Sequence, residues 1–445
     1  MQDRSLRCSR RKFLASAAAA ALGSGLASAD GNVPLDAKNF RSRPPKPMRN
    51  GRKPIAVLTT VYRPLSHSYH IAGRFIHGYG RDGQFHVPKH YVASMFVDQL
   101  PENDLSRDLG REFDIRQSRS IEDALTLGTD KLAVDGVLLI GEHGNYPRND
   151  KEQILYPRYE FMEKIVEVFR KTGETCPVFN DKHLSYSWAK AKKMYDWSQQ
   201  LKFPFLAGSS LPVTWRRPEL EPALETPFED VLVAAYGPIE VYGFHALETL
   251  QVMAERRKGG ETGVKAVTCL TGADVWKAGD AGKWSWELLE AALGRSESLN
   301  PGDVRRNAGQ MPVGNQPRIP ATAFLVEYRD GTRGTVLLLS GHINDFCFAG
   351  RIKGETKAAS CMFHLPPPPG AKYFDCQVAN IEKMLETDKP PYPVERTLLT
   401  SGVLDAVMES HHRRGARVET SELEVRYAAP ADSGYFRGSV AAPVG

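Results

Sequence analysis

Short apolar runs alternate with longer amphipathic segments from residue 53 to residue 207, and this alternation constrains the fold more than any other feature. The sequence predicts strands at 55–60, 91–97, 114–117, 134–140, 176–179 and 203–207. Helices are expected between them, at 66–79, from about 104, and at 120–127, 159–171 and 187–200. Strands that alternate with helices in this way are typical of a parallel sheet with crossover connections. We therefore predict a doubly wound α/β domain over residues 53–210.

The pattern changes after residue 211. Strand-like runs at 231–236, 266–270, 321–328 and 335–340 follow without regular helices between them, and Asp330-Gly331 is a tight-turn signal between the last two. Helices are expected at 245–257, near 377–385 and within 394–417, followed by a terminal strand at 423–427. These elements predict an α+β domain with an open, mainly antiparallel sheet over 211–428. A flexible tail is expected at 429–445.

The first 29 residues have the pattern of a twin-arginine export signal. Ser9-Arg10-Arg11-Lys12-Phe13-Leu14 is followed by an Ala-rich apolar stretch and by Ala27-Ser28-Ala29, a small-residue cleavage site before Asp30. The apolar stretch has about a dozen residues, too few for the roughly 20 that span a bilayer, so no stable membrane insertion is expected. We predict a periplasmic or otherwise exported protein, recognised by the twin-arginine machinery, with a flexible tether at 30–52.

Net charge and cysteine content argue against nucleic-acid binding and against a framework of disulfides. The formal net charge is +5, and the leader, with five basic residues and one acidic, holds +4 of it. The rest of the chain is nearly neutral and has no dense basic run, so nucleic-acid binding is not expected. Five cysteines remain beyond the leader without a CxxC pair, which indicates isolated buried thiols or at most one disulfide.

The turn after the first expected strand lacks the GxGxxG fingerprint of dinucleotide sites, since no glycine lies between that strand and Gly73. Thr60 and Tyr62 lie in this turn and are taken as cofactor-binding candidates. Asp98 closes the next strand, where an acidic residue could hold ribose hydroxyls. A structural role for Asp98 is an open alternative.

Charged groups follow two further strands. Glu142 and His143 lie in the glycine-hinged loop after residue 140, and Asp181, Lys182 and His183 follow the strand at 176–179. Carboxyl ends of parallel strands meet at one crevice, so these groups are expected to converge. Incidental charges at helix N-termini are the alternative interpretation.

Histidines and tryptophans elsewhere give weaker indications. His245 begins an expected helix and could act as a general acid or base, although a packed core histidine is equally consistent with the pattern. His67 and His70 lie in a histidine-rich stretch, but their spacing is not that of HExxH, and no metal site is predicted. A tryptophan-rich stretch is compatible with sugar stacking or with core packing; its members are Trp276, Trp284 and Trp286.

The order of elements and three local matches resemble the glucose-fructose oxidoreductase and inositol dehydrogenase family (Gfo/Idh/MocA), in which a Rossmann domain precedes an antiparallel substrate domain. Residues 178–185 look like the Glu-Lys-Pro segment of that family, with Asp181 for Glu and Lys182 for Lys. Residues 243–248 are similar to the segment with the catalytic histidine, here His245, and the third match is the closing part of the chain from 394 to 427. The resemblance implies NAD or NADP as cofactor, Lys182 and His245 as catalytic residues, and a homo-oligomer formed through the open sheet. Glu142, His143 and Asp181 are then candidates for cofactor contacts.

Two departures mark a divergent member. The glycine fingerprint is absent, and Val241 stands where the family has an aspartate before the histidine; Glu240 and Glu248 are both near enough to replace it. The leading hypothesis is an exported oxidoreductase that acts on a sugar, polyol or related carbohydrate, with a nicotinamide nucleotide in a nonstandard site. One alternative is a redox-inactive carbohydrate lyase or hydrolase, and another is a noncatalytic periplasmic carbohydrate-binding protein.

Overall fold

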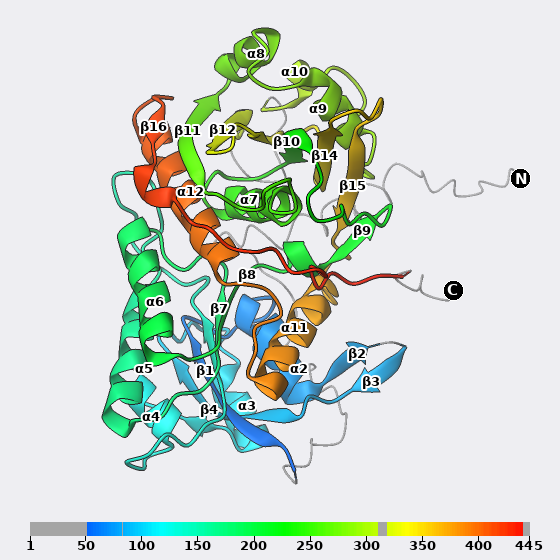
Figure 1. The fold of residues 1–445 in the computed structure, drawn as a ribbon. Coiled ribbons are helices and arrows are strands. Elements are labelled where there is room, and N and C mark those ends of the chain that lie inside the picture. The colour runs from blue at the N-terminus through cyan, green and yellow to red at the C-terminus, as the bar shows by residue number, and fades with distance from the viewer. Residues whose placement is uncertain (1–50, 82, 310–317, 439–445) are drawn as a thin grey trace, which may run out of the picture.

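The computed structural model describes residues 51–81, 83–309 and 318–438 (Figure 1). The expected leader and nearly all of the tether lie outside these ranges, so they stay predictions. Among the helices of the described residues, none has the length and apolarity needed to cross a membrane.

The first domain is built on a six-stranded parallel sheet, as the alternating pattern predicts. Its strand order is β5-β4-β1-β6-β7-β8. The strands are β1 (Lys53–Thr59), β4 (His90–Val97), β5 (Arg116–Gln117), β6 (Val137–Ile140), β7 (Val178–Asp181) and β8 (Phe205–Gly208). The central strands are apolar and buried on both faces, which is the requirement for a sheet covered by helices on both sides. The chain order crosses over at β1, so the carboxyl ends of β1 and β6 form the switch point at which this class of fold binds ligands.

Helices cover both faces of this sheet. One face packs against α4 (Ile121–Thr126), α5 (Arg158–Thr172) and α6 (Trp188–Leu201), and the other against α2 (His67–His77) and α3 (Ser106–Phe113). α11 (Tyr373–Thr387), from the distant end of the chain, joins α2 on the second face. Arg74 on α2 donates to Asp375 on α11 at 2.5 Å. The predicted domain boundary at residue 210 therefore does not match the packing in one respect. α11 lies beyond this boundary in the sequence but completes the core of the first domain.

A small hairpin of β2 (Tyr79–Arg81) and β3 (Gln84–His86) was not expected from the sequence. The expected helix at 66–79 ends two residues early, because Gly78 adopts φ 81° and caps it. Tyr79 and His86 both bond to Glu382 of α11, at 2.5 and 2.9 Å. The hairpin is thus held by α11 and not by its own short pairing.

The second domain contains an eight-stranded sheet with the order β16-β11-β12-β13-β10-β14-β15-β9. Its strands are β9 (Trp215–Arg217), β10 (Phe228–Ala235), β11 (Val264–Thr271), β12 (Thr322–Tyr328), β13 (Arg333–Leu338), β14 (Phe346–Ile352), β15 (Ala359–His364) and β16 (Val418–Glu419). All neighbours are antiparallel except β10 and β13. The sheet is therefore mixed and mainly antiparallel, as expected. The predicted terminal strand at 423–427 is wrong: residues 421–423 form a 3₁₀ turn, and the pairing with β11 is made earlier, by β16.

Both faces of this second sheet are covered. α7 (Val241–Ala254) and α12 (Glu395–His412) pack on one face. α8 (Ala273–Asp280), α9 (Trp286–Leu293) and the short α10 (Val304–Asn307) lie on the other face, as Figure 1 shows at its top. Trp284 is buried under these helices, and its indole N–H donates to the Val275 carbonyl at 3.0 Å. We call α8, α9 and α10 the helical cap; its tryptophans pack within the protein and do not line the cavity described below.

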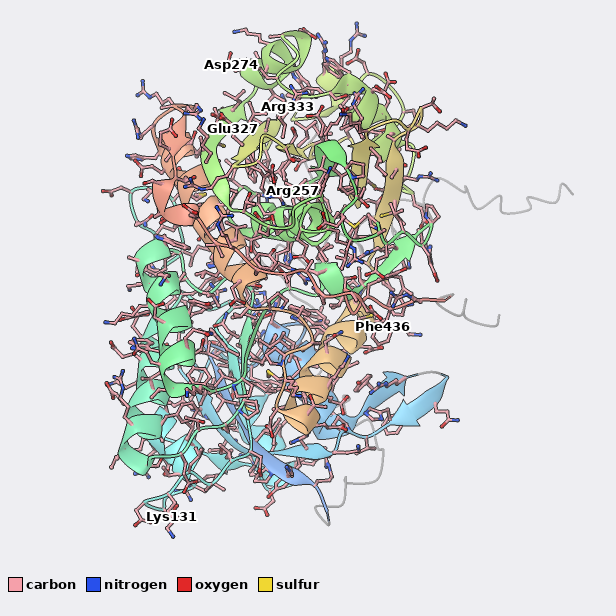
Figure 2. All side chains as sticks on the ribbon, in the orientation of Figure 1. Lys131, Arg257, Asp274, Glu327, Arg333 and Phe436 are labelled. Carbon is pink, nitrogen blue, oxygen red and sulfur yellow. The ribbon has the colours of Figure 1, made fainter. Side chains whose placement is uncertain are left out.

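Buried ion pairs join the elements of the second domain. Arg257 follows α7 in the interior of the domain (Figure 2), and it pairs with Glu261 at 2.8 Å and with Asp330 at 2.6 Å. Arg396 of α12 is bidentate on Glu255, with both partners buried. Such pairs satisfy each other's charge inside the protein. The five cysteines at 176, 269, 347, 361 and 376 are buried and free, as isolated thiols were expected to be.

The expectation of a flexible tail from residue 429 is wrong as far as residue 438. Ser433 and Tyr435 are buried, and the Phe436 amide donates to the Val213 carbonyl at 3.0 Å. Arg216 donates to the Ser433 hydroxyl, also at 3.0 Å. The small and polar residues of this segment show no periodicity from which these contacts could be predicted. Residues 439–445 lie outside the described part of the chain.

Candidate functional site

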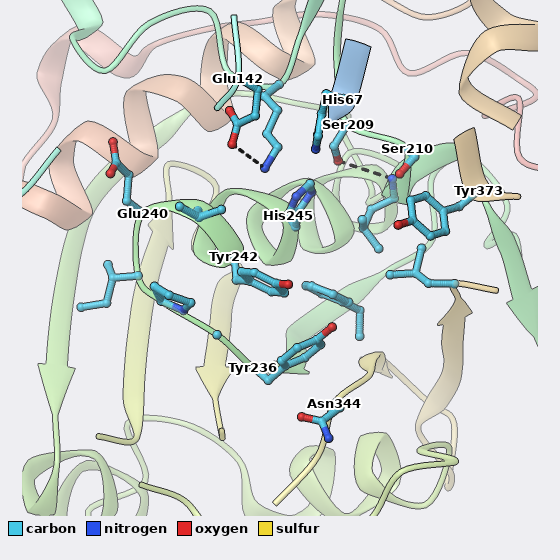
Figure 3. A pocket seen from close by; sticks show the side chains of 18 of the residues that line it. His67, Glu142, Ser209, Ser210, Tyr236, Glu240, Tyr242, His245, Asn344 and Tyr373 are labelled. Atoms are coloured by element: carbon cyan, nitrogen blue, oxygen red, sulfur yellow. Dashed lines mark hydrogen bonds and ion pairs between the residues drawn. The ribbon is translucent and has the colours of Figure 1, made fainter. Parts of the chain in front are cut away.

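A cavity of about 1020 Å³ lies between the two domains. The ends of β6 and β7 and the start of α2 form its wall on the first domain. α7, Tyr236 after β10, and Phe346 of β14 form the wall on the second domain, and Tyr373 and Phe374 of α11 close one side (Figure 3). The strand ends that the sequence singled out therefore do converge, at the switch point of the parallel sheet.

Glu142 is the centre of a buried charge cluster in this wall. Its carboxylate accepts from Arg158 of α5, and its other oxygen lies 3.3 Å from the Lys182 ammonium. Burial alone would raise the pKa of Glu142, but the positive charges of Lys182 and Arg158 hold that pKa below its usual range. Glu142 is thus an anion that fixes the Lys182 side chain at the cavity.

The backbone at both strand ends takes a conformation that is rare for non-glycine residues. His143 has φ 71° and Lys182 has φ 67°, both in the left-handed region. The Asn180 side-chain amide donates to the carbonyls of residues 181–183, and the Lys182 amide donates to Gly208 at 3.0 Å. Backbone strain of this kind persists where the surroundings hold it and clusters at functional sites. Here it turns both side chains toward the cavity.

His67 and Asp181 form a second polar pair in the same wall. The Nδ1 atom of His67, the first residue of α2, lies 2.6 Å from the carboxylate of Asp181, which is fully buried. His143 lies with its ring centroid 5.2 Å from that of His67. Burial and the neighbouring His67 lower the pKa of His143 to about 3, so its imidazole is neutral near pH 7.

His245 projects from α7 into the cavity, opposite Glu142 and His67 (Figure 3). Tyr242 and Phe346 flank it, with ring centroids 6.1 and 6.2 Å from that of His245. Burial lowers the pKa of His245 well below its ordinary value, and the charge of Lys182 lowers it further. The His245 ring is therefore neutral and can accept a proton.

Aromatic rings form the floor of the cavity on the second domain. Tyr242 is nearly parallel to Phe346, with an interplanar angle of 10°, and Tyr236 lies 4.8 Å from Tyr242. Apolar faces of this kind pack against the C–H faces of sugar rings, while neighbouring polar groups bond their hydroxyls. This floor was not expected from the sequence, although Tyr236 at a strand end and Tyr242 one helical turn before His245 were a signal for it.

The two glutamates that could replace the family aspartate lie in different places. Glu240 lines the cavity and accepts from the Ile154 amide at 2.8 Å, and Arg148 lies 3.5 Å away. Burial raises the pKa of Glu240 to about 7. Glu248 points away from the cavity and accepts from the Ser209 amide at 2.6 Å, so only Glu240 can reach a ligand.

Three of the expected cofactor residues do not line the cavity. Thr60 is buried and donates to the Glu142 carbonyl, and Tyr62 packs in the core beneath α2 with its carbonyl accepting from Leu105. Asp98 is exposed and accepts from the Tyr146 hydroxyl at 2.6 Å. Without the fingerprint glycines, the turn carries side chains that pack inward. Glu142, His143, Asp181, Lys182 and His245 do line the cavity.

Several buried polar atoms around the cavity have no hydrogen-bond partner within the described residues. They are Nδ1 of His143, Nδ1 of His245, Oδ1 of Asp181, Oε2 of Glu240 and Oε1 of Gln377. Buried polar atoms ordinarily have partners, so a ligand with several amide or hydroxyl groups fits these positions. The nicotinamide end of a dinucleotide and a sugar meet this requirement. The turn after β1 does not suit a pyrophosphate, because Tyr62 packs into the core there and Ser66 caps α2. In the part of the chain that the structure describes, no three His, Cys, Asp or Glu side chains are placed to bind a metal.

No protein-family model and no curated protein matches this sequence. Solved structures do match. The myo-inositol dehydrogenase of Lactobacillus casei in complex with NAD(H) and myo-inositol is 9% identical with a TM-score of 0.50, over 83% of this chain and 96% of that one. The scyllo-inositol dehydrogenase of the same organism is 10% identical with a TM-score of 0.50, over 84% and 100% of the two chains.

GenD2 from gentamicin A biosynthesis, in complex with NAD, gives a similar result. It is 13% identical with a TM-score of 0.50, and the match covers 85% of this chain and 99% of that chain. At these identities the likeness concerns the arrangement of elements. The chain thus has the two-domain fold of the inositol dehydrogenases, with a Rossmann-like domain followed by a domain with a mainly antiparallel sheet.

Proposed function

We propose that this protein is a nicotinamide-dependent oxidoreductase that acts on a sugar or polyol in the cavity between its domains. The observation that carries the proposal is the pairing of Lys182 and His245 across that cavity, above an aromatic floor. The solved structures of the same fold support it, since they include inositol dehydrogenases and an NAD(H) complex.

The chain's own residues supply acid-base groups for such a reaction. Neutral His245 can accept the proton of a substrate hydroxyl, and the Lys182 ammonium can donate a hydrogen bond to the same oxygen. Glu142 keeps that ammonium in place. Tyr242 and Phe346 provide an apolar face for the sugar ring. A bound nicotinamide would supply the hydride acceptor or donor.

His143 and Asp181, at the ends of β6 and β7, are the residues that would contact the nicotinamide end. The pyrophosphate would need partners other than the turn after β1, because Tyr62 is packed there. The exception within that turn is Arg63, whose side chain lines the cavity and is a suitable cation. We therefore keep NAD and NADP as the proposed cofactors, in a nonstandard site.

Export to the periplasm is part of the proposal and is supported by the twin-arginine pattern at 9–14. That machinery carries folded cargo, so a nucleotide would enter the protein before export. Fractionation of cells that produce the full chain tests this: the protein should reach the periplasm, and replacement of Arg10 and Arg11 by Lys should retain it inside. If the variant with both arginines replaced still reached the periplasm, export by the twin-arginine route would be contradicted.

The nucleotide is tested on the purified, folded protein. Denaturation followed by mass spectrometry should release NAD or NADP, or added nucleotide should bind in calorimetry. With myo-inositol and NAD as probes, Lys182→Ala and His245→Ala should each lower kcat by about 10²–10⁴, the usual contribution of a general acid or base. Lys164→Ala, on the exposed face of α5, is the matched control and should leave kcat unchanged.

The packed turn after β1 favours a second candidate function, that of a carbohydrate lyase or hydrolase that uses no nucleotide. If the protein neither contains nor binds a nucleotide, the same acid-base groups would serve a carbohydrate lyase or hydrolase. That enzyme would lose turnover in the same two alanine variants without added nucleotide. A noncatalytic carbohydrate-binding protein would change only its affinity for the sugar in both variants.

A further inference from the structure

His67 and Asp181 form a hydrogen-bonded pair in the wall of the cavity, and His67 has no role in the proposed reaction. Nδ1 of His67 lies 2.6 Å from Oδ2 of Asp181, and the carboxylate is fully buried. A carboxylate can only accept, so Nδ1 carries the proton and Nε2 is left as an acceptor. Figure 3 shows the His67 ring entering the cavity from α2, pointing toward His245.

The fold positions this pair with independent contacts on each partner. Ser66 caps α2 by accepting from the Tyr69 amide, which fixes His67 as the first helical residue. Asp181 is the last residue of β7, in register with Gly208 of β8. Phe374 packs edge-on against the His67 ring, with centroids 5.2 Å apart. The ring is thus held in one orientation before any ligand binds.

Another histidine-carboxylate pair in the chain shows a different environment. His86 lies 2.9 Å from Glu382, but that carboxylate also accepts from Tyr79, and the pair lies away from the cavity. Asp181 has His67 as its partner, and its Oδ1 atom is buried without one among the described residues. A buried carboxylate with one imidazole partner stabilises the imidazolium that forms when Nε2 takes a proton.

We propose that His67 is a further catalytic residue, a second base that faces His245 across the cavity: its Nε2 takes the proton from the substrate hydroxyl on its own side, while Asp181 holds Nδ1–H. The O–H bond breaks, an N–H bond forms at Nε2, and the electron pair stays on the substrate oxygen. The inference rests on the proposed function in one respect, that the cavity holds the hydroxylated substrate. Asp181 holds His67 through Oδ2, and its Oδ1 atom, which has no partner among the described residues, remains for the proposed cofactor contact.

Other titratable groups face the same space as the His67 ring. On α2 and the strand ends these are His70, Glu142, His143 and Lys182, and from α7 His245. A readout that reports His67 alone is therefore required. Side-chain ¹⁵N spectra of histidine-labelled protein distinguish the two tautomers and follow each ring through its titration.

The first test is spectroscopic and needs no nucleotide. In the wild-type protein the His67 ring should be the Nδ1–H tautomer, and in Asp181→Asn, where a neutral amide replaces the carboxylate, its Nδ1–H signal should shift. Assignment comes from the signal lost in His67→Gln. Glu382→Gln is the matched control, and among the histidine rings it should shift the signal of His86 only. An Nε2–H tautomer, or a His67 Nδ1–H signal unchanged in Asp181→Asn, overturns the inference.

The second test uses turnover of myo-inositol or of the carbohydrate that proves to be the substrate. His67→Gln should lower kcat at least 100-fold with little change in KM, and Asp181→Asn should lower kcat and move the acidic limb of its pH profile to lower pH. His86→Gln should leave both unchanged. Full turnover in His67→Gln overturns the inference. Loss of nucleotide binding with an intact His67–Asp181 hydrogen bond would contradict only the proposed function.

Discussion

Glu248 is a buried carboxyl in which burial favours the protonated form, against the hydrogen bonds from Ser209 and Thr397 that favour the charged form. Thr397 has one hydroxyl proton and two acceptors in range, the Ala207 carbonyl at 2.9 Å and Glu248 at 3.0 Å. A protonated Glu248 can donate to Thr397 while Thr397 donates to Ala207. Burial raises the pKa of Glu248 to about 7, so between about pH 4.5 and 7 the folded state binds a proton that the unfolded state lacks.

The wild-type protein should therefore lose stability from this group as the pH rises through that range. Glu248→Gln removes the titration, and we expect the difference in unfolding free energy between pH 5 and pH 8 to shrink by up to about 3 kcal/mol. Urea unfolding at both pH values measures it. Glu167→Gln, at an exposed pair with Lys164, should show no such change.

Glu142→Gln leaves two buried cations, Lys182 and Arg158, without their common anion. Removing one partner of a buried charge pair typically costs about 3–5 kcal/mol, and we expect a destabilisation of that order. The same urea experiment measures it at pH 7, with Glu167→Gln as a control that should cost less than about 1 kcal/mol. A loss no larger than the control's would mean that the cluster is not needed for stability.

The sequence was sufficient to place Glu142, His143 and Lys182 at one crevice, because strand ends in a parallel sheet share an edge. The role of His245 was expected from the family resemblance, and the structure places its side chain in the same cavity. The sequence was not sufficient to predict that Thr60 and Tyr62 point away from the cavity and into the protein. Whether a side chain after a strand points to the crevice or into the core depends on the path of the turn, and seven residues between β1 and α2 allow many paths. His67 was found only once Asp181 was seen beside it.

Among the elements, the helical cap was not expected. The sequence predicted no helices over 273–307, because glycines interrupt this segment and its apolar runs are short, so that helices of two turns are not recognised. The expected strands of the parallel sheet were found because a buried strand needs a continuous apolar run. β14 and β15 were missed since runs of this length fit a buried helix equally well.

Trp284 anchors this cap against the sheet. Trp284→Ala should lower the free energy of unfolding by about 3–5 kcal/mol, the usual cost of emptying a large aromatic site. The variant should also bind an apolar dye on the uncovered face. Lys277→Ala, on the exposed side of α8, is the control. Equal stability of the two variants would show that the cap does not stabilise the sheet.

At the scale of the whole molecule, the cap bears on the expected homo-oligomer. That expectation required an open sheet, and the apolar face that would meet a partner packs internally against α8 and α9. We expect the purified protein to be a monomer. Size-exclusion chromatography with light scattering should give the mass of one chain at micromolar concentration. A stable dimer would require an interface elsewhere on the molecule.

The contribution of α11 to the first domain sets a condition on how the protein acquires its structure during synthesis. Arg74 and its partner Asp375 are 301 residues apart in the chain. A ribosome must therefore translate most of the second domain before the face of the first sheet next to α2 is closed. Until then that face is exposed to the cytosol, so the growing chain is a natural client for chaperones. A fragment that stops near residue 210 would lack the helix that covers it.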